Sequence, residues 1–286
     1  MRRHTAAAIL SALSALLLLA ATPAPAAAQI VDASRVAVDN DSIRRAFDKG
    51  PYFVLYKDNY FIFGTSVGPK PTKQNTNVKF QISIQQKLTK SVMPWGTYLY
   101  LFFTQKVFWN ILENSMPMTD LNFNPGIGLA KPLFVKGQFI GKVIFSLEHE
   151  SNGKDGTASR SWNKVSLGAS IMIDPTFMVH GKVWIPIVDG VENKDILDYC
   201  GIYQMGTSFS TPNRRFGASV ILTKRKGWKL NYNTVIELNW RIFPRDNQYL
   251  FLQYYNGYGE GLLAYKEFHS ALRVGIVIKP TLFSEY

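Results

Sequence analysis

Cysteine is almost missing from this sequence of 286 residues, in which Cys200 stands alone. A single cysteine excludes an internal disulfide framework and any zinc site built from several cysteines. Because no neighbouring residue marks it as a nucleophile, we interpret Cys200 as a buried or unreactive thiol. The hydrophobic fraction of 47% excludes a disordered chain, and the mean hydropathy of −0.04 excludes a bundle of membrane helices.

Acidic residues are missing from the first 28 positions. A basic start is followed by an apolar stretch over residues 6–21, and three alanines at 26–28 come just before Gln29. This order is typical of a secretory signal peptide with a small-residue cleavage site. We therefore predict a signal peptide over residues 1–28, with an uncleaved membrane anchor as the alternative.

Charge of one sign is not gathered in any stripe or tail, although the formal net charge is +12. Nucleic-acid binding usually shows such a concentrated basic region. Lipopolysaccharide and anionic lipid headgroups explain the positive balance equally well. We therefore predict no nucleic-acid partner.

Long hydrophobic runs are also missing after the predicted signal peptide, where no stretch approaches the roughly 18–20 apolar residues of a membrane-spanning helix. Apolar residues instead alternate with polar ones over residues 78–85, 230–242 and 272–279. Successive side chains of a strand point to opposite faces, so each such strand has one apolar and one polar face. Turn-rich pieces separate the strands, for example Gly68–Pro71 and Asn152–Gly156.

The apolar faces allow two kinds of all-β protein. A soluble sandwich or lipocalin-like barrel hides its apolar face inside, whereas a transmembrane barrel turns that face to lipid. The export signal, the many amphipathic strands and the 14% aromatic content favour the second. We predict a transmembrane antiparallel β-barrel of about 12 strands, of the outer-membrane type. It forms a single domain at 29–286, with a short N-terminal segment at 29–50 and the barrel at 51–286.

One predicted hairpin carries the chemistry. His149 and Ser151 continue the apolar row of the outgoing strand, which we interpret as lipid-facing, and a turn centred near Gly156 places His149 opposite Asn163. Directly opposed side chains have Cβ atoms roughly 4.5–5.5 Å apart, so the Asn163 amide oxygen can accept the imidazole N–H. A serine, a histidine and a group that orients the histidine are what nucleophilic acyl transfer requires. The alternative is an ordinary Ser-Asn-Gly turn beside an interfacial histidine.

The residues of this hairpin resemble the signature of the outer membrane phospholipase A family. The two pieces read His149-Glu150-Ser151-Asn152-Gly153 and Ser159-Arg160-Ser161-Trp162-Asn163. Further similar stretches are Tyr56–Tyr60, Thr104–Lys106, Asn122–Pro125 and Tyr255–Glu260. The resemblance therefore covers nearly the whole mature chain.

The resemblance implies a twelve-stranded barrel whose active site lies on the outer face. It implies that Ser151 is the nucleophile, that His149 is the general base, and that Asn163 orients the histidine. The backbone N–H of Gly153 is the implied oxyanion donor. Unlike the aspartate of the familiar serine proteases, Asn163 carries no charge and stabilises the imidazolium less.

The resemblance also implies calcium dependence and a homodimer. The implied calcium ligands are the Lys154 carbonyl, the Ser159 hydroxyl and a Ser115 donated by the other subunit. Gly156 departs from the family, since some members carry there an aspartate used in a second calcium arrangement. The candidates to replace it are Asp155, Glu192 and Asp195. We include Glu192 among the expected metal ligands.

Two further polar residues lie on strands next to the implied site or interface. Glu150 points away from Ser151 and is interpreted as a lumen or loop charge. Gln105 lies in phase with Leu101 and Phe103, and the resemblance implies that it is a dimer-interface glutamine. A lumen-facing Gln105 is the alternative, because both faces of this strand are apolar.

The residues of the hairpin, taken with this resemblance, predict a calcium-dependent outer-membrane phospholipase that is activated by dimerisation. It is expected to hydrolyse the sn-1 and sn-2 acyl esters of glycerophospholipids and lysophospholipids. The rivals are a passive porin-like channel and an adhesin or purely structural barrel. None of these rivals needs Ser151, His149 and Asn163 on the lipid-facing side of the strands.

Overall fold

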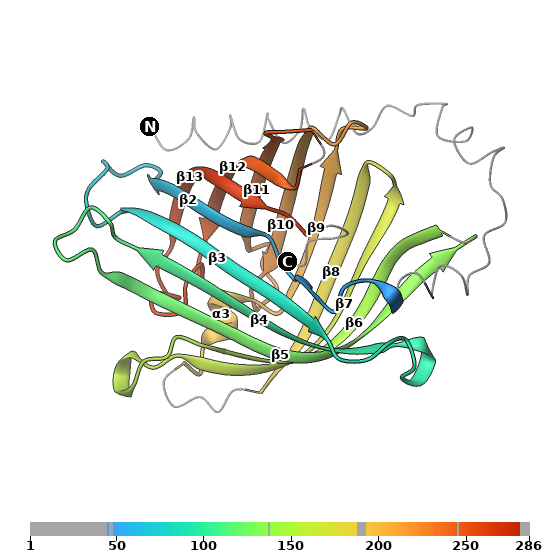
Figure 1. Ribbon diagram of the computed structural model, residues 1–286. Coiled ribbons are helices and arrows are strands. Elements are labelled where there is room, and N and C mark those ends of the chain that lie inside the picture. Colours follow the sequence, from blue (N-terminus) through green and yellow to red (C-terminus); the bar gives the residue numbers. More distant parts are fainter. Residues whose placement is uncertain (1–44, 46–47, 137, 188–192, 245, 281–286) are drawn as a thin grey trace. The chain divides into compact units, whose positions relative to one another are not determined.

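The computed structural model describes residues 45, 48–136, 138–187, 193–244 and 246–280 (Figure 1). The predicted signal peptide at 1–28 and nearly all of the predicted segment at 29–50 lie outside the described residues. Within the described ranges, no helix is long and apolar enough to cross a membrane.

Antiparallel strands make up most of the described chain (Figure 1). They are β1 (Phe53–Leu55), β2 (Asn59–Ser66), β3 (Thr76–Lys87), β4 (Tyr98–Trp109), β5 (Met118–Val135), β6 (Gln138–Ser151), β7 (Ser161–Asp174), β8 (Phe177–Ile187), β9 (Tyr203–Ser210), β10 (Phe216–Lys224), β11 (Tyr232–Arg241), β12 (Gln248–Gly257) and β13 (His269–Ile278). The helical pieces are η1 (Pro94–Gly96), η2 (Gly156–Ala158) and α3 (Ile196–Cys200).

The strands close into a ring. Each strand from β3 to β12 pairs with its two sequence neighbours, and β13 pairs with β2. The short β1 pairs with the same strand as β2, namely β3, but further along it. The pieces β1 and β2 therefore form one interrupted strand, and the predicted antiparallel barrel of about 12 strands is confirmed.

The barrel is polar inside and apolar outside. On β3, Ser83 is 0% exposed, whereas its neighbour Ile82 is 49% exposed. On β13, Arg273 is buried between the exposed Leu272 and Val274. This is the arrangement predicted for a transmembrane barrel, and it excludes the soluble sandwich or lipocalin-like alternative.

The two ends of the barrel differ. The described loop residues at 110–117, 152–160, 193–202, 225–231 and 258–268 lie at one end, called here the loop end, because antiparallel strands alternate in direction. The described residues of the connections at 136, 175–176, 211–215, 242–244 and 246–247 lie at the other, the turn end. At the loop end, Trp162, Ile196, Leu262 and Tyr265 pack together from β7, α3 and the β12–β13 loop.

Charged groups fill the barrel interior. Glu260, from the β12–β13 loop, lies 2.9 Å from the Lys79 ammonium, 2.8 Å from the Arg273 guanidinium and 2.6 Å from the His269 imidazole. Glu260 is buried, as are Lys79 and Arg273. The Glu260 side chain thereby joins the β12–β13 loop to β3, which carries Lys79, and to β13, which carries Arg273 and His269.

Candidate active site

The hairpin of β6 and β7 has the register that the sequence predicts. His149 pairs with Asn163, Phe145 with Leu167, and Val143 with Ala169. Phe145 and Leu147 are exposed on the outside of the barrel, in the same alternating row as His149. The histidine and its partner therefore lie on the apolar outer wall, at the loop end of the strands.

His149 and Asn163 are in direct contact. The Nδ1 atom of the imidazole lies 2.9 Å from the Oδ1 atom of the Asn163 amide. An amide oxygen only accepts, so this contact places the proton of a neutral His149 on Nδ1. The Nε2 atom is then free to accept a proton, which is the state that a general base needs.

The backbone of His149 is held from β5 as well. Pro125 lies opposite His149 and has no N–H, so the backbone ladder between β5 and β6 is interrupted there. The side-chain amide of Asn124 donates instead to the His149 carbonyl, at 2.8 Å. The histidine is thus fixed both through its ring and through its main chain.

Ser151 is the last residue of β6 and lies two residues beyond His149 on the same face. Its cross-strand partners are Phe123 on β5 and Ser161 on β7. Its hydroxyl makes no hydrogen bond to any described residue, the imidazole of His149 included. Catalytic hydrogen bonds are often long before substrate binds, so the geometry is compatible with a serine nucleophile.

The chain turns sharply after Ser151. Gly153 has a φ of +63°, and a Cβ atom there would lie 3.0 Å from Cε2 of Phe123. The backbone conformation therefore favours glycine, and the aromatic ring leaves little room for a side chain. The N–H of Gly153 donates to none of the described residues, so it is available to an oxyanion formed at Ser151.

Asn152 organises the loop at 152–160. Its side chain is buried, donates to the Ala158 carbonyl at 2.9 Å, and accepts from the Arg160 N–H at 2.9 Å and the Lys154 N–H at 3.3 Å. Arg160 in turn donates to the Ser159 carbonyl at 2.7 Å. These bonds fix the backbone on both sides of the loop's exposed tip.

The implied calcium ligands Lys154 and Ser159 lie in this loop, on either side of η2. Carbonyl and hydroxyl oxygens are the hard donors that calcium prefers, and the Ser159 hydroxyl makes no hydrogen bond to a described residue. Clusters of three His, Cys, Asp or Glu residues that could hold a metal are not found in the described ranges. A site built from carbonyls and hydroxyls does not need one.

Of the other two expected ligands, the structure describes only Ser115. Ser115 lies exposed in the β4–β5 loop with a φ of +64°. This loop is at the same end of the barrel as Ser151, but among the described residues no hydrogen bond joins Ser115 to the 152–160 loop. Glu192 lies outside the described residues.

The inner face of the hairpin carries a separate set of charges. Glu150 lies 2.8 Å from the Lys164 ammonium, and Glu148 lies 2.6 Å from the Lys182 ammonium. Glu150 therefore lies on the inner face and pairs with Lys164, as expected of a lumen or loop charge. In α3, burial raises the pKa of the Cys200 thiol to about 12, which favours the thiol over the nucleophilic thiolate.

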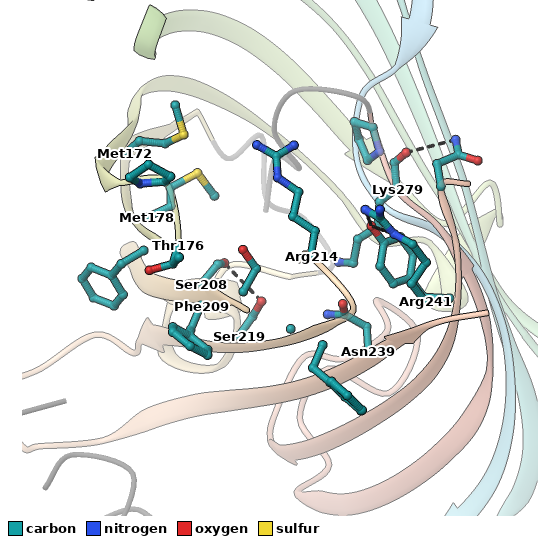
Figure 2. A pocket seen from close by; sticks show the side chains of 18 of the residues that line it. Met172, Thr176, Met178, Ser208, Phe209, Arg214, Ser219, Asn239, Arg241 and Lys279 are labelled. Atoms are coloured by element: carbon teal, nitrogen blue, oxygen red, sulfur yellow. Dashed lines mark hydrogen bonds between the residues drawn. The ribbon is translucent and has the colours of Figure 1, made fainter. Parts of the chain in front are cut away.

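Figure 2 shows a cavity of about 510 Å³ at the turn end. Arg214, Arg241 and Lys279 line it, together with the hydroxyls of Ser208 and Ser219, which lie 3.1 Å apart. The cavity is at the opposite end of β7 from Asn163. It therefore takes no part in the chemistry of the hairpin.

The sequence of the hairpin does not indicate two residues that contact the site from another strand. Phe123, which restricts Gly153, and Asn124, which holds His149, both come from β5. Only the three-dimensional pairing of β5 with β6 reveals their contacts, although both belong to a stretch that carries the family resemblance.

Comparisons with known proteins agree with the geometry. The sequence profile of the family described as phospholipase A1 matches residues 51–278. Phospholipase A1 of Escherichia coli K12 is 28% identical over 207 residues, which cover 70% of this chain and 69% of the relative. Phospholipase A1 of Proteus vulgaris gives the same identity and coverage.

Solved structures show the same fold. Outer membrane phospholipase A from Escherichia coli superposes with a TM-score of 0.70 at 23% identity, covering 81% of this chain and 93% of that one. The Salmonella typhi outer membrane phospholipase dimer with bound calcium gives a TM-score of 0.71 at 23% identity, covering 85% and 99%.

Proposed function

The chain belongs to the phospholipase A1 family, and we propose that it hydrolyses acyl esters of glycerophospholipids in the bacterial outer membrane. The observation that carries the proposal is the 2.9 Å contact between His149 and Asn163 on the apolar outer wall, two residues from Ser151. The proposed substrates are the sn-1 and sn-2 esters of phospholipids and lysophospholipids. The outward position suits these substrates, because their ester groups lie at the depth where the wall meets the headgroups.

In the proposed first half-reaction, the Ser151 Oγ atom attacks the ester carbonyl carbon. Nε2 of His149 accepts the hydroxyl proton, and the Asn163 amide oxygen holds Nδ1–H so that the ring keeps its orientation. The N–H of Gly153 donates to the carbonyl oxygen as negative charge develops on it. His149 then gives its proton to the leaving alcohol oxygen, and the acyl group remains on Ser151.

In the second half-reaction, water replaces the alcohol. His149 accepts a proton from the water as it attacks the acyl carbon, and the fatty acid leaves as Ser151 takes that proton back. Each half-reaction therefore uses the same proton acceptor. The products are a fatty acid and a lysophospholipid, or glycerophosphodiester when the substrate is already a lysophospholipid.

We propose that calcium binds at the loop end of this hairpin. The ligands would be the Lys154 carbonyl and the Ser159 hydroxyl, completed by the partner subunit's Ser115 and by Glu192. Bound there, calcium adds positive charge beside the developing oxyanion. The bonds made by Asn152 fix both halves of the loop, so the ligand oxygens need little reorganisation on binding.

We also propose that the active form is a homodimer. Gln105 lies in the outward-facing row of β4 that contains the exposed Leu101, and not in the inward row of the buried Phe102 and Thr104. A polar amide on a lipid-facing wall is costly unless it has a partner, and a second copy of Gln105 offers one. Such an interface is compatible with the partner subunit's Ser115 serving as a calcium ligand.

Release of fatty acid from phospholipid mixed micelles by the refolded mature protein tests the proposal. Wild type is compared with Ser151→Ala, and each is measured with calcium and with a chelator. Thr207→Ala, which removes a hydroxyl from the outer wall of β9, is the matched control. Release that requires Ser151 and calcium but not Thr207 is expected.

A folded, dimeric, calcium-supplied protein that releases no fatty acid would overturn the proposal. Conductance across a planar bilayer, unchanged in Ser151→Ala, would then support the porin-like alternative. Equal specific activity of chemically crosslinked monomers and dimers would contradict only the proposal that dimerisation activates the enzyme.

A further inference from the structure

The strand that carries Asn163, β7, begins two residues before its last described pair with β8. That pair is Asn163 with Ile187, whereas β7 begins at Ser161. The described part of β8 therefore ends short of Ser161. Yet Ser161 is the cross-strand partner of Ser151, so its position bears directly on the proposed nucleophile.

A side chain bonds both backbone groups of Ser161. The Oδ1 atom of Asn193 accepts from the Ser161 N–H at 3.2 Å, and its Nδ2 atom donates to the Ser161 carbonyl at 2.9 Å. A side-chain amide has the same donor and acceptor as a peptide group, so it continues the ladder by one step. Asn193 is only 3% exposed, which protects both bonds from water.

Further contacts hold the segment that carries Asn193 against the start of β7. The Asn193 carbonyl accepts from the Ile196 N–H at 3.1 Å. Ile196 is fully buried and packs in the cluster with Trp162, the residue that follows Ser161. The loop before α3 and the start of β7 are therefore joined by hydrogen bonds and by apolar packing.

We propose that Asn193 is a positioning residue of the active site, which fixes the start of β7 and thereby sets Ser151 against the His149–Asn163 pair. This inference rests on the proposed hydrolytic function. Reactive groups must be placed within a fraction of an ångström, and a displacement of about 1 Å can cost on the order of 10²-fold in rate. Among the described residues, Asn193 bonds to Ser161 and Ile196 and not to His149, Ser151 or Asn163, so its proposed effect is on geometry.

Asn233 provides a matched control. It is 5% exposed on β11, donates to the Tyr199 carbonyl at 2.6 Å and accepts from the Tyr258 N–H at 2.9 Å. It thus makes the same two kinds of bond at the same end of the barrel, away from the hairpin. A general loss of stability affects both positions, whereas loss of active-site geometry affects only Asn193.

The experiment measures kcat and KM for fatty-acid release by wild type, Asn193→Ala and Asn233→Ala, with Ser151→Ala as the inactive reference. We expect Asn193→Ala to lower kcat about 10- to 100-fold with KM within about twofold of wild type. Asn233→Ala is expected to keep kcat within about twofold. The rate at which a phosphonate ester labels Ser151, normalised to the folded fraction on a gel, corrects for protein that has not folded.

Two results would overturn the inference: a folded Asn193→Ala that retains wild-type kcat and labelling rate, or equal losses of kcat in both asparagine variants. An inactive wild type would instead refute the proposed function, and the inference with it.

Discussion

At the scale of the residue, the neutral character of Asn163 fits its position. A carboxylate on an outward, apolar wall would have to lose much of its hydration, whereas an amide accepts the imidazole N–H without burying a charge. The 2.9 Å contact holds the imidazole ring through a neutral hydrogen bond. In the proposed mechanism, Asn163 therefore supplies the correct tautomer and little electrostatic stabilisation of the imidazolium.

Asn163→Ala is expected to lower kcat on the order of 10²-fold, since it releases the ring of His149 without removing the base. Asn163→Asp keeps an acceptor at the same place and is expected to retain more activity than the alanine variant. Fatty-acid release measured across pH, with folding checked by gel mobility, tests both variants. Wild-type kcat in Asn163→Ala would show that the amide does not orient His149.

Residues that face each other across one tight hairpin can be predicted from sequence, because register follows from the position of the turn. The pairing of His149 with Asn163 is of this kind. The roles of Phe123 and Asn193 could not be predicted in this way, because their contacts depend on where other strands and loops lie.

At the scale of the element, the loop at 152–160 is organised by one buried side chain. The bonds of Asn152 to Ala158 and Arg160 join the two sides of the loop, so that the exposed tip carries the proposed calcium ligands on a fixed base. A loop that is ordered before binding loses less conformational entropy when it binds an ion.

Asn152→Ala is therefore expected to raise the calcium concentration for half-maximal activity about tenfold, the effect of losing hydrogen bonds worth about 1.4 kcal/mol. Activity at saturating calcium should fall less. A calcium titration of fatty-acid release measures both quantities. Asn213→Ala is the control, because Asn213 bonds within the β9–β10 turn at the opposite end. An unchanged calcium midpoint would mean that the loop does not hold the ion.

The strands were predictable because alternation with period two is a local property of the sequence. The interruption between β1 and β2 could not be predicted from this alternation, because hydrogen bonds to a residue of β3 stabilise it. Ser83 accepts from the Lys57 N–H at 3.2 Å through its hydroxyl, and its own N–H donates to the Asn59 side chain at 2.7 Å. Side-chain bonds of this kind replace backbone pairing and leave no pattern in the chain itself.

At the scale of the whole molecule, the interior is stabilised by charges that are buried together. Burial raises the pKa of Glu260 in the β12–β13 loop, but the Arg273 guanidinium and the Lys79 ammonium lower it more, to well below its usual range. Because this folded pKa is lower than the unfolded value of about 4.3, the stabilisation is complete above that pH. It is lost as the pH falls through the folded pKa.

Glu260→Gln is expected to reduce the free energy of unfolding at pH 7 by about 3 kcal/mol, because it leaves two buried cations without their counter-charge. The difference in the free energy of unfolding between the variant and wild type should narrow at strongly acidic pH. There the wild-type carboxyl is protonated and is neutral like the glutamine. Urea unfolding in micelles, followed by tryptophan fluorescence across pH, measures this difference. Glu267→Gln, at an exposed position of the same loop, is the control. A difference that is constant with pH would contradict this account.

The pairing of β2 with β13 also constrains how the barrel is made. The earliest and the latest strands to leave the ribosome are neighbours in the finished ring. Until β13 arrives, β2 and β12 each present an unpaired edge, which lipid cannot satisfy with hydrogen bonds. A chain truncated before His269 therefore has no stable resting state in a bilayer, and insertion of the ring is expected to be a single, all-or-none event.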